Sequence, residues 1–380
     1  MMTKRILYVY GGLYIPNGMN AIISQKVNYL AENTDSEVYI SLTERAELPH
    51  YYRLSSKVRW INFNINFDEL DTLPLYKKLW KYWWKQRQFK KCLSDYMMRI
   101  RPDISISVCR REVNFITKIK DGSKKVAEIH FGRTFYRKLD KKYLPGFLNR
   151  LLSKIWVNGL ISNLKQMDRF VVLTNEDALN WPELDNLIVI PNFVTSISAH
   201  LSDLSSNRVI AVGRYSWQKG FDLLLDAWCV VHSKYPEWRL DIYGGGDNGF
   251  YQKLASEKML SSVVTCHAAV SDILDKYVQS SVFVLSSRYE GFGLVLVEAM
   301  SAGLPVVSFD CPCGPRDIVR DGENGLLVES GNVNQLAEKL CYLISHKDER
   351  VRMGRNAHAS IQQFDKEVIM KKWIELFEIL

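Results

Sequence analysis

Short apolar runs with strand character alternate with helix-length segments along this chain, in two successive series. In the first half the runs are Arg5–Tyr10, Glu37–Leu42, Val58–Phe63, Asp103–Val108, Lys125–His130 and Phe170–Leu173. In the second half they are Arg208–Val212, Arg239–Tyr243, Val263–Cys266, Val282–Leu285 and Pro305–Phe309. Because strands separated by helices form parallel sheets with covering helices, the sequence predicts an α/β fold with two Rossmann-like domains.

The boundary between the two series is expected near Ile190 and Pro191, just before a serine-rich polar stretch, Thr195–Asn207. The last segment, 365–380, repeats apolar residues at helical spacing. We therefore expect a first domain over 1–190, a second over 191–364, and a terminal helix over 365–380. A chain of 380 residues is long enough for two domains of ordinary size.

The composition, with 47% hydrophobic and 24% charged residues, is that of a globular protein. The sequence contains no apolar run of about 18 residues, so we expect no membrane-spanning helix. Its seven cysteines, an odd number without regular spacing, indicate a reducing compartment. We therefore expect a cytoplasmic protein.

Charge is distributed unevenly between the two halves. Residues 1–190 have 31 Lys and Arg against 19 Asp and Glu, a net charge of +12. Residues 191–380 have 19 against 23, a net charge of −4, and the two halves add to the +8 of the chain. A basic first half suits anionic lipid headgroups or an acceptor that bears phosphate.

One segment of the basic half, Leu75–Leu93, has seven Lys or Arg residues and no acidic residue. A helix here would gather apolar residues near one face and lysines on another: Leu75, Leu79, Trp83 and Phe89, against Lys77, Lys81 and Lys85. Basic amphipathic helices with tryptophans are typical of membrane interfaces, and Trp80 and Trp84 add to this character. A second basic, aromatic stretch is Arg133–Lys165. The alternative for both is a core-packed helix with a solvated basic face.

Two glutamates, Glu290 and Glu298, enclose a glycine-broken turn that leads from an apolar strand into a helix. The turn Gly291-Phe292-Gly293 exposes backbone N–H groups at the helix N-terminus, where the helix dipole favours an anion such as a diphosphate. Glu298 lies about five residues into the helix, roughly 7–8 Å along its axis, which suits a ribose beside the phosphates. Glu290 precedes the helix, where a sugar on the other side of the phosphates would lie. The alternative is a surface turn with two solvated acids.

Two cations follow the strand that ends at Val212: Arg214 after Gly213, and Lys219 before Gly220. Open α/β sheets bind ligands at the carboxyl ends of their strands. Fixed cations at such an edge can neutralise a bound phosphate and stabilise negative charge that develops on it. Since no D-x-D pair is suitably placed, we expect these side chains to replace a metal ion, and we expect no cofactor. The alternative is a helix-capping turn with solvated charges.

Taken together, these motifs resemble those of the retaining glycosyltransferases of family 4, which have the GT-B fold. The run Glu290–Glu298 matches their E-x7-E signature, and Gly213-Arg214 with Lys219-Gly220 matches G-R-x4-K-G. The loop Asp310–Ile318 is similar to the D-C-P-x-G-P-R loop of bacterial surface-polysaccharide enzymes, with a rigid turn without ligand contact as the alternative. The resemblance covers nearly the whole chain, although its specific motifs lie in the second half. It implies two Rossmann-like domains facing across a cleft, with the terminal helix crossing back to the first.

The resemblance also implies roles for residues of the second domain. Glu290 would hold hydroxyls of the donor sugar, Glu298 the ribose, and Arg214 and Lys219 the diphosphate. Further donor-binding positions are the backbone at Phe292, Gly293, Leu294, Gly213 and Gly244. The run Tyr243–Gly249 formally contains G-x-G-x-x-G, but the next strand ends without the ribose-binding acid of an NAD site. It is therefore interpreted as the G-x-G loop of the donor domain.

Three further residues are candidates by resemblance. Val270 lies in the loop that borders the nucleobase, and the alternative is an ordinary valine at a strand end. Gly18 opens the first helix, where its backbone would approach the diphosphate or the acceptor; Asn20 stands where this family commonly has glutamate. His130, at the end of the strand Lys125–His130, resembles the histidine that reaches the donor sugar, with a structural histidine as the alternative. Candidate catalytic residues are thus Glu290, Arg214, Lys219 and His130, with no metal ligands.

The sequence therefore predicts a retaining, metal-independent hexosyltransferase. It would move a hexose or N-acetylhexosamine from a nucleotide-diphosphate sugar, expected to be a UDP-sugar, to a glycan acceptor. A polyprenyl-diphosphate-linked acceptor in capsule or O-antigen polysaccharide biosynthesis is expected, with the enzyme peripheral at the inner face of the cytoplasmic membrane. The alternative is a catalytically silent GT-B subunit that stabilises an active partner, although the chain keeps both acids and both cations. No nucleic-acid partner is expected, because no recognition module is present.

Overall fold

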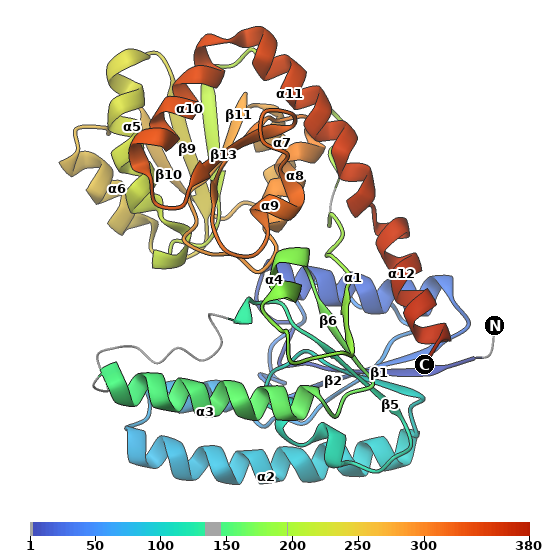
Figure 1. Ribbon diagram of the computed structural model, residues 1–380. Helices are drawn as coiled ribbons and strands as arrows, with labels where there is room; N and C mark the ends of the chain where they lie inside the picture. The colour runs from blue at the N-terminus through green and yellow to red at the C-terminus, as the bar shows by residue number, and fades with distance from the viewer. Residues whose placement is uncertain (1–2, 134–145, 196) are drawn as a thin grey trace. The chain divides into compact units, whose positions relative to one another are not determined.

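The computed structural model describes residues 3–133, 146–195 and 197–380, which form two compact α/β units (Figure 1). The first unit consists of Met1–Leu173, Ala178–Ile190 and Met370–Leu380. The second consists of Thr174–Asp177 and Pro191–Ile369. Each unit contains one parallel sheet with flanking helices, so the predicted fold class is confirmed.

The first unit has a seven-stranded sheet in the order β3-β2-β1-β4-β5-β6-β7. Its strands are β1 (Arg5–Val9), β2 (Glu37–Leu42), β3 (Arg59–Asn62), β4 (Ile104–Ser107), β5 (Lys124–Glu128), β6 (Arg169–Val172) and β7 (Leu187–Val189). Its helices include α1 (Gly18–Asn33), α2 (Leu75–Ile100) and α3 (Gly146–Leu164), while α4 (Asn175–Leu179) is shared between the units. Residues Met370–Leu380, which include most of the terminal helix α12 (Lys366–Glu378), also belong to this unit.

The second unit has a six-stranded sheet in the order β10-β9-β8-β11-β12-β13. Its strands are β8 (Arg208–Val212), β9 (Arg239–Gly244), β10 (Val264–Ala268), β11 (Val282–Leu285), β12 (Val306–Asp310) and β13 (Gly325–Glu329). Its helices are α5 (Phe221–Lys234), α6 (Asn248–Glu257), α7 (Ile273–Val278), α8 (Leu294–Ser301), α9 (Pro315–Ile318), α10 (Val333–Ser345) and α11 (Lys347–Ser360). The strand order reverses between β8 and β11, the kind of switch point at which open α/β sheets bind ligands.

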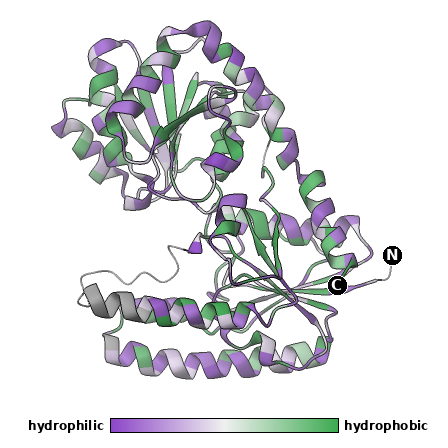
Figure 2. Cartoon of the chain, viewed as in Figure 1, coloured by the Kyte–Doolittle hydropathy of each residue, from purple (hydrophilic) through white to green (hydrophobic). Residues whose placement is uncertain are grey.

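Apart from β3, β7 and β10, the strands are buried on both faces along most of their length, which explains their continuous apolar runs. Figure 2 shows hydrophobic residues along the strands of both sheets. In β1, Ile6 to Val9 are at most 1% exposed, and in β11, Val282 to Leu285 are at most 3% exposed. Such runs can be recognised in a sequence, and each predicted strand forms with its ends within two residues of the expected ones.

Two strands, β7 and β13, were not predicted. Strand β7 has only three residues and ends just before the boundary between the two units at Ile190 and Pro191. Strand β13 begins at Gly325, which reads as a turn residue in the sequence. Packing requires this glycine, because a Cβ atom there would come within 2.5 Å of Cγ2 of Val306 on the neighbouring strand.

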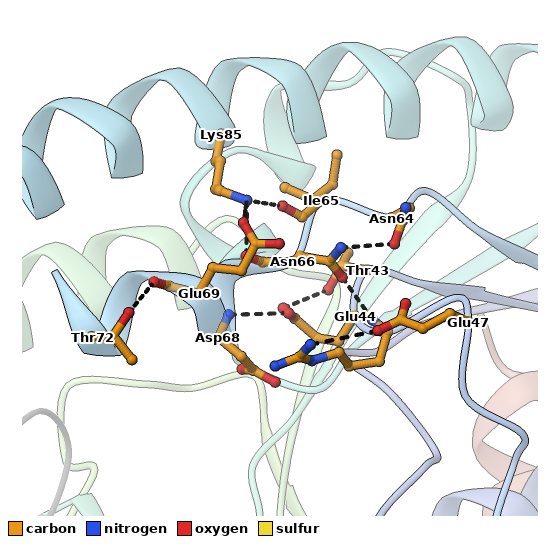
Figure 3. A network of polar contacts seen from close by, with 11 residues as sticks. Thr43, Glu44, Glu47, Asn64, Ile65, Asn66, Asp68, Glu69, Thr72 and Lys85 are labelled. Atoms are coloured by element: carbon orange, nitrogen blue, oxygen red, sulfur yellow. Dashed lines mark hydrogen bonds and ion pairs between the residues drawn. The ribbon is translucent and has the colours of Figure 1, made fainter.

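Helix α2 is fixed to the first unit through Lys85, whose Nζ donates hydrogen bonds to the carbonyl oxygens of Ile65 and Asn66 (Figure 3). Lys85 was predicted to share a face with Lys77 and Lys81. Those two lysines are exposed, whereas the Lys85 side chain is only 12% exposed because its ammonium contacts these loop carbonyls. The apolar residues that were predicted near one face also differ in their exposure. Phe89 is 1% exposed and lies in the core, whereas Leu79 and Trp83 are 63% and 52% exposed.

Among the helices that the structure describes, none combines the length and apolar character needed to span a membrane. Of the second basic, aromatic stretch, Arg133–Lys165, residues 134–145 lie outside the described residues.

Candidate active site

Glu290 and Lys219 form an ion pair in the second unit, with 2.7 Å between Oε1 and Nζ. Glu290 lies in the loop after β11, and Lys219 lies in the turn between β8 and α5. Because β8 and β11 are adjacent, the sheet brings the two side chains together at its switch point. Ser287 donates a second hydrogen bond to Oε1 of Glu290 over 2.6 Å. The carboxylate is therefore held in one position by two donors.

Close backbone packing allows the Lys219 turn to lie against the sheet. A Cβ atom at Gly244 would come within 1.8 Å of the carbonyl oxygen of Gly213. A Cβ atom at Gly213 would in turn meet Cδ and Cε of Lys219 at 3.0 Å. Gly220 has φ +63°, and a Cβ atom there would lie 2.1 Å from the carbonyl oxygen of Ser286. The predicted glycines Gly213 and Gly244 thus make room for the lysine.

Arg214 lies in the same turn, and its side chain is exposed. Its guanidinium makes no hydrogen bond or ion pair with any residue that the structure describes. The turn itself is held by Arg288, which pairs with Asp222 through contacts of 2.9 and 2.6 Å and lies 4.6 Å from the ring centroid of Trp217. Arg214 is therefore a cation available to a ligand, on a turn fixed by other groups.

The predicted residues Phe292, Gly293 and Leu294 lie together at the N-terminus of α8. Gly293 is the N-cap residue, with φ +94°, so no side chain caps this helix, and its first turn contains no acidic residue. Phe292 is 3% exposed, and its ring packs edge-on against Phe364 with 5.5 Å between centroids. The free N–H groups and the helix dipole make this end favourable for an anion.

The loop Asp310–Ile318 contacts both Glu290 and the residues at the N-terminus of α8. The carbonyl oxygen of Pro312 accepts a hydrogen bond from the backbone N–H of Glu290 over 3.0 Å. Gly314 has φ +133°, and a Cβ atom there would lie 2.0 Å from the carbonyl oxygen of Phe292. Backbone contacts of this loop thus fix the positions of Glu290 and Phe292.

Glu298 lies within α8 and is partly buried. Its Oε1 accepts a hydrogen bond from Oγ1 of Thr195 over 2.9 Å. Burial raises the pKa of Glu298 to about 7, although the Thr195 hydrogen bond and the charge of Lys219 act in the opposite direction. In the absence of a ligand this carboxyl is thus protonated below neutral pH. Once ionised, it can accept hydrogen bonds from ligand hydroxyls.

Val270 lies two residues after β10 and is 41% exposed. Within β10, His267 stacks on Tyr243 of β9 with 4.3 Å between ring centroids and an interplanar angle of 8°. Asp241, Tyr243 and His267 line a cavity of about 660 Å³, which neither Val270 nor Glu290 lines. The structure thus does not join the candidate base contact to this cavity.

His130 lies in the first unit, two residues after β5, so the predicted strand end was too late. Its side chain is 3% exposed, and Nε2 lies 2.9 Å from Oε1 of Glu128. Lys26 of α1 contacts the same oxygen, and its Nζ lies 4.0 Å from the ring centroid of Trp373. Burial opposes ionisation of Glu128, but the charges of Lys26 and His130 outweigh it and lower the pKa of Glu128 to about 2. His130 thus belongs to a buried ionic cluster.

Gly18 is the first residue of α1 and is exposed. The side chain of Asn17 caps this helix by accepting a hydrogen bond from the N–H of Asn20 over 2.8 Å. Asn20 is 2% exposed, and its Nδ2 donates to the carbonyl oxygen of Ile15 over 2.7 Å. Asn20 therefore stabilises the start of α1 through these two hydrogen bonds.

Sequence reasoning missed several groups that contact the predicted residues. Ser287 stands three residues before Glu290, and a hydroxyl at that spacing was a signal available in the sequence. Thr195 and Glu298 are 103 positions apart, so the sequence alone gives no sign of their contact. The same holds for Lys26 and Glu128, which are 102 positions apart.

Comparisons with known proteins show what this chain is similar to. Residues 195–360, which include both glutamates and both cations, match the family model described as "Glycosyl transferases group 1". An uncharacterized glycosyltransferase of Haemophilus influenzae is 33% identical over 211 residues, 54% of this chain and 60% of that protein. The poly(ribitol-phosphate) alpha-N-acetylglucosaminyltransferase of Staphylococcus aureus is 30% identical over 223 residues, 57% of this chain and 45% of that protein. The chain thus spans about half the length of the curated relatives it matches.

Among solved structures, S. aureus TarM in complex with fondaparinux, alpha-GlcNAc-glycerol and UDP has a TM-score of 0.76. The two chains are 17% identical, and the similarity covers 99% of this chain and 100% of TarM. This likeness shows the fold, which is GT-B.

Proposed function

We propose that this chain is a retaining, metal-independent glycosyltransferase of the family 4 type. It transfers a hexose or N-acetylhexosamine from a nucleotide-diphosphate sugar to a glycan acceptor in polysaccharide biosynthesis. The observation that carries this proposal is the Lys219–Glu290 ion pair beside the uncapped N-terminus of α8. A cation, a carboxylate and free backbone donors at one sheet edge are what an activated sugar with a diphosphate requires.

In this proposal the diphosphate lies at the N-terminus of α8, where Arg214 and Lys219 neutralise it. Negative charge grows on the leaving phosphate as its bond to the anomeric carbon breaks. Fixed cations and N–H groups stabilise that charge without reorganising during the reaction. Lys219, which contacts only Glu290 among carboxylates in the described structure, then shares its charge with the phosphate.

The two glutamates hold the ends of the donor. Glu290 accepts hydrogen bonds from hydroxyls of the transferred sugar, and Ser287 and Lys219 keep its carboxylate in place. Glu298 accepts hydrogen bonds from the ribose. Amides around Phe292, Gly293 and Leu294 hold sugar and phosphate oxygens. No covalent nucleophile is assigned. The acceptor oxygen bonds to the anomeric carbon from the side on which the phosphate leaves, and the leaving phosphate takes the hydroxyl proton, so the anomeric configuration is retained.

The proposal also gives roles to two residues of the first unit. His130 acts on the donor sugar, and Nε2 of its ring lies 2.9 Å from Oε1 of Glu128. Gly18, exposed at the start of α1, offers backbone N–H groups to a phosphate or to the acceptor.

The identity of the substrates is part of the proposal. UDP as the nucleotide is supported by the TarM complex, which contains UDP in the same fold. A phosphate-bearing acceptor is supported by the relative named for poly(ribitol-phosphate) and by the +12 charge of residues 1–190. We place the enzyme at the inner face of the cytoplasmic membrane, with a polyprenyl-diphosphate-linked glycan as the expected acceptor.

Calorimetry with a panel of nucleotide sugars in the presence of EDTA tests this function. We expect at least one UDP-sugar to bind, to be hydrolysed slowly, and to give a product whose first-formed anomer keeps the donor configuration by NMR. Arg214→Ala should abolish binding, and Arg355→Ala, which removes an exposed arginine of α11, is the matched control. The proposal is refuted if no nucleotide sugar binds or if EDTA abolishes binding.

A further inference from the structure

Five large apolar side chains are exposed on the N-terminal part of α2. They are Tyr76 (70% exposed), Leu79 (63%), Trp80 (68%), Trp83 (52%) and Trp84 (54%), and we call this set the aromatic face. Their spacing of three and four residues places them on one side of the helix. Isolated exposed apolar residues are ordinary, but a contiguous set of this size marks an interaction surface.

The other side of α2 is fastened to the first unit, so the aromatic face is held outward. Phe89 and Leu93 on that other side are buried. Lys85 donates hydrogen bonds to the loop carbonyls of Ile65 and Asn66 and lies 3.1 Å from Oε2 of Glu69 (Figure 3). The aromatic face could turn inward only by breaking these contacts.

Cations continue the aromatic face along the same side of the helix. Arg87, Lys90 and Lys91 are exposed and follow Trp83 and Trp84 at helical spacing. The guanidinium of Arg87 lies 3.7 Å from the ring centroid of Trp83, so the aromatic and basic parts touch. Since no acidic residue occurs in Leu75–Leu93, no charge of this segment opposes the approach of an anionic surface.

We infer that the aromatic face binds the headgroup region of an anionic lipid bilayer. Tryptophan and tyrosine rings are amphipathic and settle at the membrane interface, while long basic side chains reach lipid phosphates. Arg87, Lys90 and Lys91 supply those contacts at one end of the inserted rings. The complementary charge selects an anionic lipid surface over a neutral one, and the basic first half of the chain strengthens the attraction.

This inference extends the proposed function, from which it takes only the expectation of a lipid-linked acceptor. A helix lying on the membrane would hold the first unit where such an acceptor is anchored. Binding to lipid needs neither donor nor acceptor, so the two ideas can fail separately.

Vesicle co-sedimentation of the full chain tests the surface, with phosphatidylcholine alone and with added phosphatidylglycerol. We expect binding only to the anionic vesicles and weaker binding at high salt. Trp80→Ser with Trp83→Ser should abolish it. Arg87→Gln, Lys90→Gln and Lys91→Gln together should weaken it by about fivefold per cation removed.

The matched control changes three exposed cations elsewhere in the first unit: Arg53→Gln, Lys118→Gln and Lys120→Gln. It should keep most of the binding, and circular dichroism should show that all variants melt as the parent does. Equal vesicle binding by parent and aromatic variant would overturn the inference. A dimer of the parent that the aromatic variant does not form, detected by light scattering, would also overturn the inference, because a second copy of the chain would then cover the aromatic face. The affinity for UDP-sugars, measured by calorimetry, should be the same in these variants as in the parent. If the parent binds no UDP-sugar, the proposed function is refuted, but the inferred membrane surface is not.

Discussion

Thr195 donates a hydrogen bond to Glu298 over 2.9 Å, which joins the first residues of the second unit to helix α8. A hydroxyl donor favours the charged carboxylate, yet burial dominates and raises the pKa of Glu298 to about 7. This carboxyl is therefore mostly in the acid form below neutral pH. A ligand that donates two hydroxyls favours the ionised form and must displace the proton.

Donor binding is accordingly expected to release a proton at pH 6. Affinity for a UDP-sugar should rise as the pH increases toward 7 and then level off, because above that value Glu298 is already ionised. Calorimetry at pH 6 in two buffers of different ionisation enthalpy measures the released protons, and a UDP-sugar is suited to this because its diester phosphates do not titrate there. Glu298→Gln should remove the buffer dependence. Identical binding enthalpies in both buffers for the parent would contradict this linkage.

We expect substitutions of Lys219 and Glu290 to have non-additive effects on stability and activity, because the two side chains form an ion pair. Lys219→Ala leaves a largely buried carboxylate whose remaining side-chain donor, among the described residues, is Ser287. Breaking a buried pair in this way typically costs about 3 kcal/mol or more. The double variant Lys219→Ala with Glu290→Gln should recover part of that loss, because no unpaired charge remains. Urea titrations of the parent, both single variants and the double variant give the coupling energy.

Transfer by each of these variants should fall by about 100-fold to 1000-fold, the usual effect of removing one preorganised transition-state contact. If the double variant recovers stability but not activity, the contribution of the pair to folding is separate from its contribution to transfer. Near-normal turnover by either single variant would rule out the proposed role for that residue.

The local motifs of the second unit could be predicted because they lie where a strand ends and a helix begins. Glu290, Glu298 and Lys219 are each placed by the loop or helix directly after a strand, so short sequence patterns locate them. The inward side of α2 could not be predicted, because the acceptors of Lys85 are loop carbonyls rather than a recognisable side-chain pattern. Long-range partners such as Thr195 required the fold itself.

The buried cluster of the first unit should dominate acid stability. The pKa of Glu128 is lowered to about 2, below the usual 4.5, so the folded state holds fewer protons than the unfolded chain between these values. The stabilisation is therefore fully present above pH 4.5 and is lost as the pH falls toward 2. Thermal melts from pH 3 to pH 6 should show a steeper decline for the parent than for the double variant Lys26→Met with Glu128→Leu.

A matched pair of glycine variants isolates the close packing that positions Lys219. A Cβ atom at Gly244 would come within 1.8 Å of the carbonyl oxygen of Gly213, whereas one at Gly245 would have no atom within 4 Å. Gly244→Ala must therefore push β9 away from the Gly213 turn, and overpacking of this kind typically costs about 1–3 kcal/mol. We expect this variant to melt earlier and to bind a UDP-sugar at least tenfold more weakly, since a binding loss of about 1.4 kcal/mol is tenfold. Gly245→Ala should match the parent in both measurements. Equal donor affinity for the two variants would show that the packing of Gly213 on Gly244 does not position the lysine.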